Sequence, residues 1–374
     1  MSAPQELYHP GLEGVIAGET SICSVEQGSL GYRGYDIDDL ARRASFEEVA
    51  YLLLHGDLPN AAQLAAFRQA IDRHRALPPD AIELLRRIKP EVPGMDVVRT
   101  GVSFISQFDP ASGDNRAAYV ERATHLLAAI PSLIAARMRL VHGQEPIAPQ
   151  PGLSHAAQFC HQAFGRMPSE IEEKVLNMTF VLYAEHEFNA STFTARVIAS
   201  TESDLYSAVT GAVGALKGPL HGGANEETAR MFQAHASAES ARAWIEDVLA
   251  RKQKVMGFGH RVYKEGDHRA RMLEEFVDGL AAAKGEQGRA AAYYTIKNVM
   301  REKKNIHMNL DYPCGFVYLM LDLPLDAYTP LFVASRVSGW AAHFIEQREN
   351  NRIIRPRSRY TGPPRRAFKP LPLR

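Results

Sequence analysis

Two histidines and one aspartate lie in breaks between helical stretches of the sequence, where their side chains are free to do chemistry. His221 stands in the run Leu-Lys-Gly-Pro-Leu-His-Gly-Gly-Ala-Asn-Glu, whose glycines and proline end the preceding helical pattern. His260 follows a Gly-Phe-Gly run, and Asp311 stands in Asn-Leu-Asp-Tyr-Pro. A lone histidine usually has a structural role, but two histidines in separate glycine-rich breaks favour a functional one. Histidine and aspartate together suit general acid–base chemistry.

Three arginines, at positions 269, 336 and 355, lie in or beside segments that glycine or proline residues delimit. The planar guanidinium group matches a carboxylate with two parallel hydrogen bonds. Most arginines in any protein lie at the surface or form ion pairs, and that interpretation stays open for each of these. Together with His221, His260 and Asp311, they predict a mostly helical enzyme that acts on an acidic substrate.

Several common catalytic patterns are absent from the sequence. It contains no HExxH, CxxC, GxxxxGK[ST] or GxSxG motif. The Gly-Phe-Gly run begins a GxGxxG pattern but lacks its third glycine, so it is weak support for a dinucleotide site. Histidine is a common metal ligand, yet the two histidines do not have the spacing of a helical ligand pair. We therefore predict no metal and no cofactor.

Composition indicates an ordinary globular protein. The chain has 374 residues, with 43 Lys plus Arg against 43 Asp plus Glu. This balance gives no global attraction to nucleic acid or to a membrane surface. The three cysteines are scattered, which fits a reducing compartment. The sequence shows no secretory signal and no apolar run of membrane-spanning length, so we expect a cytoplasmic protein.

The periodicity predicts an all-α fold with one short β-hairpin near the N-terminus. Residues 11–35 hold the β-prone segments Val15–Ala17 and Ser21–Val25, and helical spacing follows from Ile37 almost to the end. Residues 305–316 are expected to form a loop that holds Asp311. The helix expected over residues 204–217 is rich in Ala and Gly, which lets two backbones pack closely. It would lie either in a tight core or across a partner subunit.

At these residues the sequence resembles the citrate synthase family. The similarity covers nearly the whole chain, and its motifs follow the family's order: Pro10–Gly14, Tyr32–Tyr35, Glu185–Thr192, Gly218–Glu226, Met256–Tyr263, Asn309–Asp311, Leu331–Trp340 and Ile354–Arg357. The resemblance implies a large helical domain, formed by residues 1–221 and 315–374, and a small mobile helical domain formed by residues 222–314. It also implies a homodimer, in which the helix over 204–217 would cross the interface.

The implied reaction is the condensation of oxaloacetate with an acyl-CoA, followed by hydrolysis of the thioester. In the family's pattern Asp311 would remove a proton from the carbon beside the thioester. His221 would hydrogen-bond the thioester oxygen as the enol forms, and His260 would polarise the oxaloacetate carbonyl. The matching oxaloacetate-binding residues are His186, His260, Arg269, Arg336 and Arg355, with Arg355 expected from the neighbouring subunit. The matching CoA-binding residues are Val255, Gly257, Phe258, Gly259 and Lys264.

Two positions depart from the pattern of many family members. Tyr183 begins the run Tyr-Ala-Glu-His, where many members have His-Ala-Asp-His, and this variant also occurs in archaeal members and 2-methylcitrate synthases. Cys314 replaces a small hydroxyl residue near Asp311. We expect both departures to bear on the choice of acyl-CoA without touching the catalytic set.

The leading interpretation is a citrate synthase that uses acetyl-CoA, and the alternative is a 2-methylcitrate synthase that uses propionyl-CoA. One extra methylene changes discrimination by only about 1–3 kcal/mol, so these motifs do not separate the two. Citryl-CoA cleavage is a third interpretation, but family members that catalyse it usually work with a CoA ligase, and this sequence has no such region. A non-catalytic CoA-binding or assembly protein of the same fold is a remote alternative, because such a relic would be free to lose the catalytic residues and arginines present here.

Overall fold

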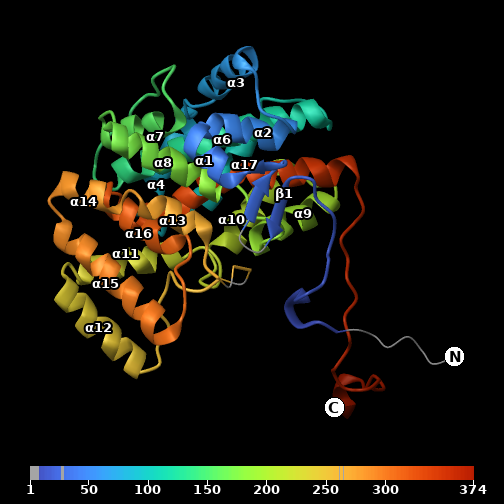
Figure 1. The fold of residues 1–374 in the computed structure, drawn as a ribbon. Coiled ribbons are helices and arrows are strands. Elements are labelled where there is room, and N and C mark those ends of the chain that lie inside the picture. The colour runs from blue at the N-terminus through green and yellow to red at the C-terminus, as the bar shows by residue number, and fades with distance from the viewer. Residues whose placement is uncertain (1–7, 27–28, 261, 264) are drawn as a thin grey trace.

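The computed structural model describes residues 8–26, 29–260, 262–263 and 265–374 (Figure 1). It is mostly helical with one small sheet near the N-terminus, which confirms the predicted fold class. The longer helices of the first half are α1 Ile37–Arg43, α2 Phe46–His55, α3 Ala61–Arg73, α4 Pro79–Arg87, α5 Gly94–Ile105, α6 Arg116–Leu140, α7 His155–Phe164 and α8 Glu170–Tyr183. Those of the second half are α9 Ala190–Ser200, α10 Leu205–Leu216, α11 Ala224–Ala234, α12 Ala238–Ala250, α13 His268–Glu274, α14 Val277–Lys284, α15 Gln287–Lys304, α16 Asp311–Met320 and α17 Tyr328–Glu349.

The N-terminal β region is a small antiparallel sheet with the strand order β1-β2-β3. Its strands are β1 Cys23–Glu26, β2 Ser29–Tyr32 and β3 Tyr35–Asp36. The predicted strand over Val15–Ala17 is wrong, because these β-prone residues lie in an exposed segment and pair with no strand among the described residues. The sheet is tied to the helical body by Tyr32, whose buried hydroxyl donates to the carbonyl oxygen of Glu185 at 3.0 Å.

Polar side chains cap the starts of several helices. Ser169 and Glu172 form the capping box of α8. Asp204 caps α10, Ser237 caps α12 and Asp267 caps α13, each by accepting a hydrogen bond from a backbone N–H in the first turn. The sequence thus determines locally where these helices start.

Two helices, α6 and α17, form the centre of the larger group of helices. They contact each other, and α17 also packs against α2, α8, α9 and α10. Nearly every residue of α17 from Tyr328 to Ile345 is buried, including Trp340. A helix that is buried on all sides has no solvent face to carry polar residues. The buried polar groups on α17 therefore need internal partners, and several of them are found in the candidate site.

A second group of helices, α11 to α16, lies together on one side of the molecule in Figure 1. Within it α12 packs on α15, and α16 packs on α11, α13 and α14. The family resemblance implies domain boundaries at residues 221 and 314. The second of these boundaries falls inside α16, and the division into a fixed and a mobile domain stays a prediction.

The two ends of the described chain leave the helical body as extended segments (Figure 1). Residues 8–19 and 355–372 are exposed, and the guanidinium of Arg359 lies 5.6 Å from the ring centroid of Tyr8. Apolar side chains on these segments are open to solvent, among them Ile16, Ile353 and Phe368. Within the described residues no helix is both long and apolar enough to cross a bilayer.

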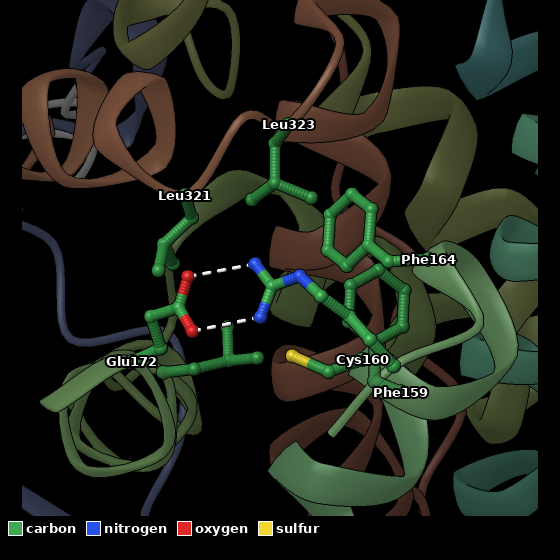
Figure 2. A pocket seen from close by; sticks show the side chains of 8 residues that line it. Phe159, Cys160, Phe164, Glu172, Leu321 and Leu323 are labelled. Carbon is green, nitrogen blue, oxygen red and sulfur yellow. Dashed lines mark hydrogen bonds and ion pairs between the residues drawn. The ribbon is translucent and has the colours of Figure 1, made fainter. Parts of the chain in front are cut away.

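A small apolar pocket lies between α7, α8 and the chain that follows α16 (Figure 2). An ion pair closes it, because Arg166 donates to the two carboxylate oxygens of Glu172 at 2.7 and 2.8 Å. These bonds lower the pKa of Glu172 to about 2. Since the pocket is too narrow for a ligand, we interpret it as a packing feature that fixes the start of α8.

Candidate active site

His221 lies in the turn between α10 and α11, as the glycines predict. The backbone N–H of Ser191 donates to Nε2 of His221 at 3.2 Å, and the hydroxyl of Ser191 lies 2.8 Å from the same nitrogen. A neutral ring that accepts at Nε2 carries its proton on Nδ1. Burial, reinforced by the charge of Arg336, lowers the pKa of His221 to about 4. His221 is therefore a neutral hydrogen-bond donor at pH 7.

Asp311 is the first residue of α16 and not part of a loop, so the predicted loop over residues 305–316 is too long. The phenol of Tyr183 donates to Oδ1 of Asp311 at 2.6 Å. Burial raises the pKa of Asp311 to about 6, against the opposing effects of this hydrogen bond and of the Arg269 and Arg336 charges. A carboxylate with a pKa near the working pH can take up a proton and release it again.

Tyr183 thus contacts the catalytic set, and the expectation that it would not is wrong. Cys314 is also close to this position, because it lies one turn after Asp311 on α16 and is fully buried. Both departures from the family pattern therefore surround the carboxylate of Asp311.

Phe332 joins His221 and Asp311 into one site. Its ring lies 4.2 Å from the ring of Tyr183 and 6.5 Å from that of His221, measured between centroids. The guanidinium of Arg336, one turn later on α17, lies 4.7 Å from the centroid of Phe332. Sequence reasoning missed a role for Phe332, although its helical spacing from Arg336 puts both residues on one face of α17.

His260 and His186 form a second cluster. The backbone N–H groups of Val262 and Tyr263 donate to Nδ1 of His260 at 3.1 and 3.2 Å, so a neutral ring carries its proton on Nε2. The rings of His186 and His260 lie 5.3 Å apart. Nε2 of His186 is 3.1 Å from the hydroxyl of Tyr263, a contact that the sequence did not indicate. Burial holds the pKa of His186 well below its usual value, with further lowering by Arg269 and Arg336.

Arg269 and Arg336 are buried, and both lie close enough to His186 and Asp311 to lower their pKa values. Arg269 donates from two nitrogens to the carboxylate of Asp267, each at 2.9 Å. Arg336 donates from Nε to the carbonyl oxygen of Tyr183 at 2.6 Å. Among the described residues no partner is bound to the Nη nitrogens of Arg336, so they are available to a carboxylate ligand. The charge of Arg336 lowers the pKa values of His186, His221 and Asp311, so it acts on all three.

The predicted CoA-binding loop lines a cavity of about 420 Å³. Val255, Gly257 and Phe258 are part of its wall, and Lys254 and Lys304 lie at the same cavity. Gly257 has a φ of 83°, and a Cβ there would come within 2.6 Å of the side chain of Thr228, so only glycine fits.

The same loop pairs with the segment before Asp311. Gly259 donates its backbone N–H to the carbonyl oxygen of His307 at 2.8 Å, and the side chain of Asn309 donates to the carbonyl oxygen of Gly259 at 2.9 Å. A further backbone bridge joins Phe258 to Met308. His260 and Asp311 are thereby attached to a single hydrogen-bonded unit.

One predicted residue is not brought to this site within the described chain. Arg355 is exposed on the C-terminal segment. Lys264 lies outside the described residues. The structure gathers His221 and Asp311 around Phe332 and Arg336, because Phe332 contacts both His221 and Tyr183, the hydrogen-bond donor to Asp311. His260 lies instead against His186 and Tyr263.

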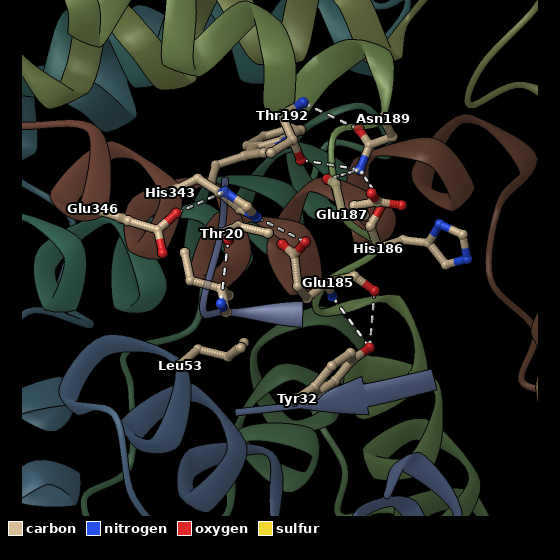
Figure 3. A network of polar contacts seen from close by, with 12 residues as sticks. Thr20, Tyr32, Leu53, Glu185, His186, Glu187, Asn189, Thr192, His343 and Glu346 are labelled. Carbon is tan, nitrogen blue, oxygen red and sulfur yellow. Dashed lines mark hydrogen bonds and ion pairs between the residues drawn. The ribbon is translucent and has the colours of Figure 1, made fainter. Parts of the chain in front are cut away.

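A buried polar network supports the segment that carries Tyr183 and His186 (Figure 3). Arg196 donates to Nδ1 of His343 at 3.0 Å, so Nε2 of His343 carries the proton and donates to Glu185 at 2.9 Å. Arg196 also donates to Glu346 at 2.7 Å. The second carboxylate oxygen of Glu185 has no hydrogen-bond partner, and it fills the space that a side chain at Gly339 would need. No local sequence pattern indicates this network, because its members come from α9, α17 and the segment that follows α8.

Comparison with known proteins places the chain in a family. A family model described as citrate synthase, C-terminal domain, matches residues 11–357. The chain is 43% identical to a citrate synthase of Mycolicibacterium smegmatis and 44% identical to 2-methylcitrate synthase 2 of Corynebacterium glutamicum, with 96% of each chain covered in both cases. A structure of citrate synthase from Thermoplasma acidophilum, in a ternary complex with carboxymethyl coenzyme A and oxaloacetate, is similar with a TM-score of 0.92 and 32% identity over 99% of this chain and 100% of that chain. The chain belongs to the citrate synthase family.

Proposed function

We propose that this enzyme condenses oxaloacetate with acetyl-CoA and hydrolyses the resulting thioester, giving citrate and CoA. One observation carries the proposal: a buried carboxylate with a pKa of about 6, Asp311, and a neutral histidine donor, His221, lie around the same arginine. This arrangement suits proton removal from a weakly acidic carbon next to a carbonyl group. The family membership supports the same reaction.

In the first step Asp311 takes a proton from the methyl carbon of acetyl-CoA. The electrons of the broken C–H bond move toward the thioester oxygen, where Nδ1–H of His221 donates a hydrogen bond. A donor placed where negative charge develops typically contributes about 3–4 kcal/mol to lowering a barrier. Because the pKa of His221 is depressed, its ring acts as a neutral donor and does not compete for the proton that Asp311 removes.

In the second step the enolate carbon attacks the keto carbon of oxaloacetate, and the keto oxygen takes up the Nε2 proton of His260. Nε2–H of His260 would polarise the keto oxygen, while His186, Arg269 and Arg336 bind the carboxylates, together with Arg355 from the neighbouring subunit. Val255, Gly257, Phe258, Gly259 and Lys264 would bind CoA, with Lys264 near a phosphate. Water then hydrolyses the citryl thioester. The proposed chemistry uses side chains alone, without metal or cofactor.

The proposal includes a homodimer in the cytoplasm. Apolar side chains such as Ile353 and Phe368 are exposed on the C-terminal segment, where they would be covered by a second subunit. Arg355 lies between them in the sequence. The small-residue face of α10 would cross the dimer interface, and closure of the small domain over the substrates would exclude water until the enol has reacted.

Mixing two inactive variants tests whether Arg355 acts across the dimer. Arg355→Ala removes a carboxylate ligand, and Asp311→Asn removes the base. If Arg355 acts on the neighbour's site, a mixed dimer has one site in which both residues are intact. Random exchange should then restore about a quarter of the wild-type kcat/KM for oxaloacetate.

The mixture is compared with each variant alone after the same unfolding and refolding. If Arg355 acted within its own chain, no mixed site would be intact, and the mixture would be no more active than the average of its components. The dimer is measured in the same samples by light scattering, so a failure to assemble is distinguished from a failure to complement.

The relative kcat/KM for acetyl-CoA and propionyl-CoA separates citrate synthase from 2-methylcitrate synthase. The curated relatives carry both names at similar identity, and Tyr183 and Cys314 beside Asp311 are the residues through which the acyl group would be sensed. We expect acetyl-CoA to be preferred. One methylene is worth about 1–3 kcal/mol, so the preference lies between about tenfold and 200-fold. A tenfold preference for propionyl-CoA would reverse the assignment and leave the mechanism unchanged.

A further inference from the structure

A second cavity, of about 380 Å³, lies next to the predicted CoA-binding loop, residues 255–260, which we call the catalytic loop. Its walls come from α13, α15 and the segment before α16. It shares only Ile306 with the proposed CoA cavity, so the two are neighbours separated by that side chain. Cavities of about 300–1,000 Å³ accommodate small-molecule ligands, and this one has room for a phosphate or a diphosphate.

The charged groups of this cavity are predominantly basic. Arg271, Lys297 and Arg301 line it together with His307, against the acids Glu274 and Asp267. Lys297 and Arg301 are four residues apart on α15 and so lie on the same face of that helix. Arg271 faces the cavity from α13. Three cationic side chains from two helices therefore converge on one space.

Both acids of the cavity are already engaged. Glu274 forms an ion pair with Lys297. Asp267 accepts two hydrogen bonds from Arg269, and the backbone N–H of Leu310 also donates to it, at 3.1 Å. Neither acid is therefore left to neutralise the two remaining arginines.

Arg271 and Arg301 have no ion pair and no side-chain hydrogen bond to any other residue that the structure describes. Each guanidinium group offers five N–H donors and no acceptor, and its planar fork matches phosphate oxygens. Two unpaired arginines at one cavity repel each other unless an anion lies between them. Ordinary surface arginines point into solvent separately, whereas Arg271 and Arg301 line the same cavity.

The cavity wall is bonded to the catalytic loop. The carbonyl oxygen of His307 accepts the N–H of Gly259, the residue before His260. Asp267 holds Arg269, a proposed oxaloacetate ligand. An anion in the cavity would therefore influence the positions of His260 and Arg269 through one or two hydrogen bonds. By the same coupling, bound substrate would change the affinity of the cavity for the anion.

We propose that Arg271 and Arg301 form a binding site for a phosphate-bearing anion on the small group of helices. Two sources share this chemistry: a phosphate of the CoA substrate itself that extends past Ile306, and a separate phosphate compound. The inference goes beyond the proposed reaction, and its test requires no turnover.

Titration calorimetry with pyrophosphate on the full-length protein tests this site. The variant Arg271→Gln with Arg301→Gln is expected to bind pyrophosphate at least about tenfold more weakly than the wild type, because it loses two charge-assisted contacts. Arg230→Gln with Arg242→Gln is the matched control. These two arginines are also exposed and lie in the same group of helices, but they pair with Glu227 and Glu246, so the control should bind pyrophosphate like the wild type.

Repeating the titration with CoA and with dephospho-CoA identifies the source. If the 3′-phosphate of CoA occupies the cavity, CoA displaces pyrophosphate and dephospho-CoA does not. If the diphosphate of CoA occupies it, both compounds displace pyrophosphate. If a separate compound does, pyrophosphate binds in the presence of saturating CoA. Each of these results supports the site. Equal pyrophosphate affinity in the wild type and in the Arg271 and Arg301 variant, or no binding to the wild type, would overturn the proposal.

Discussion

Asp311→Asn is expected to lower kcat about 10³-fold or more and to leave oxaloacetate binding nearly unchanged. The amide keeps the shape of the carboxylate but cannot accept the proton from acetyl-CoA, and a positioned general base typically contributes about 10²–10⁴ in rate. The proposed oxaloacetate ligands lie on other segments, so they stay in place. Citrate formation measures kcat, and calorimetry with oxaloacetate measures binding. Full activity in this variant would exclude Asp311 as the base.

The wild-type pH profile gives a second measurement of the same residue. Only ionised Asp311 can act as the base, so activity should be low below pH 6 and rise as the pH passes through about 6. Tyr183→Phe is the matched control. It removes the hydrogen bond that stabilises the ionised carboxylate, so the pKa of Asp311 should increase and the rise should move to higher pH. An unshifted profile in Tyr183→Phe would assign the rise to another group.

His343→Ala is expected to destabilise the protein by about 3–5 kcal/mol, the range found when one partner of a buried polar pair is removed. In this variant Glu185 would lose its donor while its second oxygen already has no partner, and Arg196 would lose one acceptor. The next residue, His186, is a proposed oxaloacetate ligand, so KM for oxaloacetate should rise more than kcat falls. Denaturant unfolding and steady-state kinetics measure the two effects.

Two further variants separate the network from general packing. His343→Gln offers one acceptor and one donor, so it should lose less stability than His343→Ala and keep KM closer to the wild-type value. Arg43→Ala breaks an exposed ion pair with Asp39 and should change stability by less than about 1 kcal/mol. Equal losses of unfolding free energy in His343→Gln and His343→Ala would show that the volume of the ring stabilises the protein and that its hydrogen bonds do not.

The elements with local signals could be predicted from the sequence. Glycines around His221 and His260 marked the breaks, and Ser169, Asp204 and Asp267 marked helix starts, because caps and glycine turns depend on a few neighbouring residues. Asp311 was assigned to a loop because Pro313 suggests a break. Proline is also tolerated in the first turn of a helix, where its missing N–H is not needed, and α16 uses it there.

Contacts between distant segments could not be read from local patterns. Tyr183 meets Asp311 across 128 positions of sequence, and Glu185 meets His343 across 158. The strand predicted over Val15–Ala17 was wrong for a related reason. A β-prone segment becomes a strand only if another strand pairs with it, and pairing is decided by the tertiary fold.

The bonds between the catalytic loop and the segment before α16 restrict how this sequence can vary in length. Gly257, Gly259 and Phe258 are paired with His307, Met308 and Asn309 in a fixed register. Asp311 follows two residues later. An inserted or deleted residue between Asn309 and Asp311 would rotate the start of α16 by about 100°, since a helix has 3.6 residues per turn, and would turn the carboxylate away from Tyr183. A change in the length of this segment is therefore expected to displace Asp311 even where every side chain is kept.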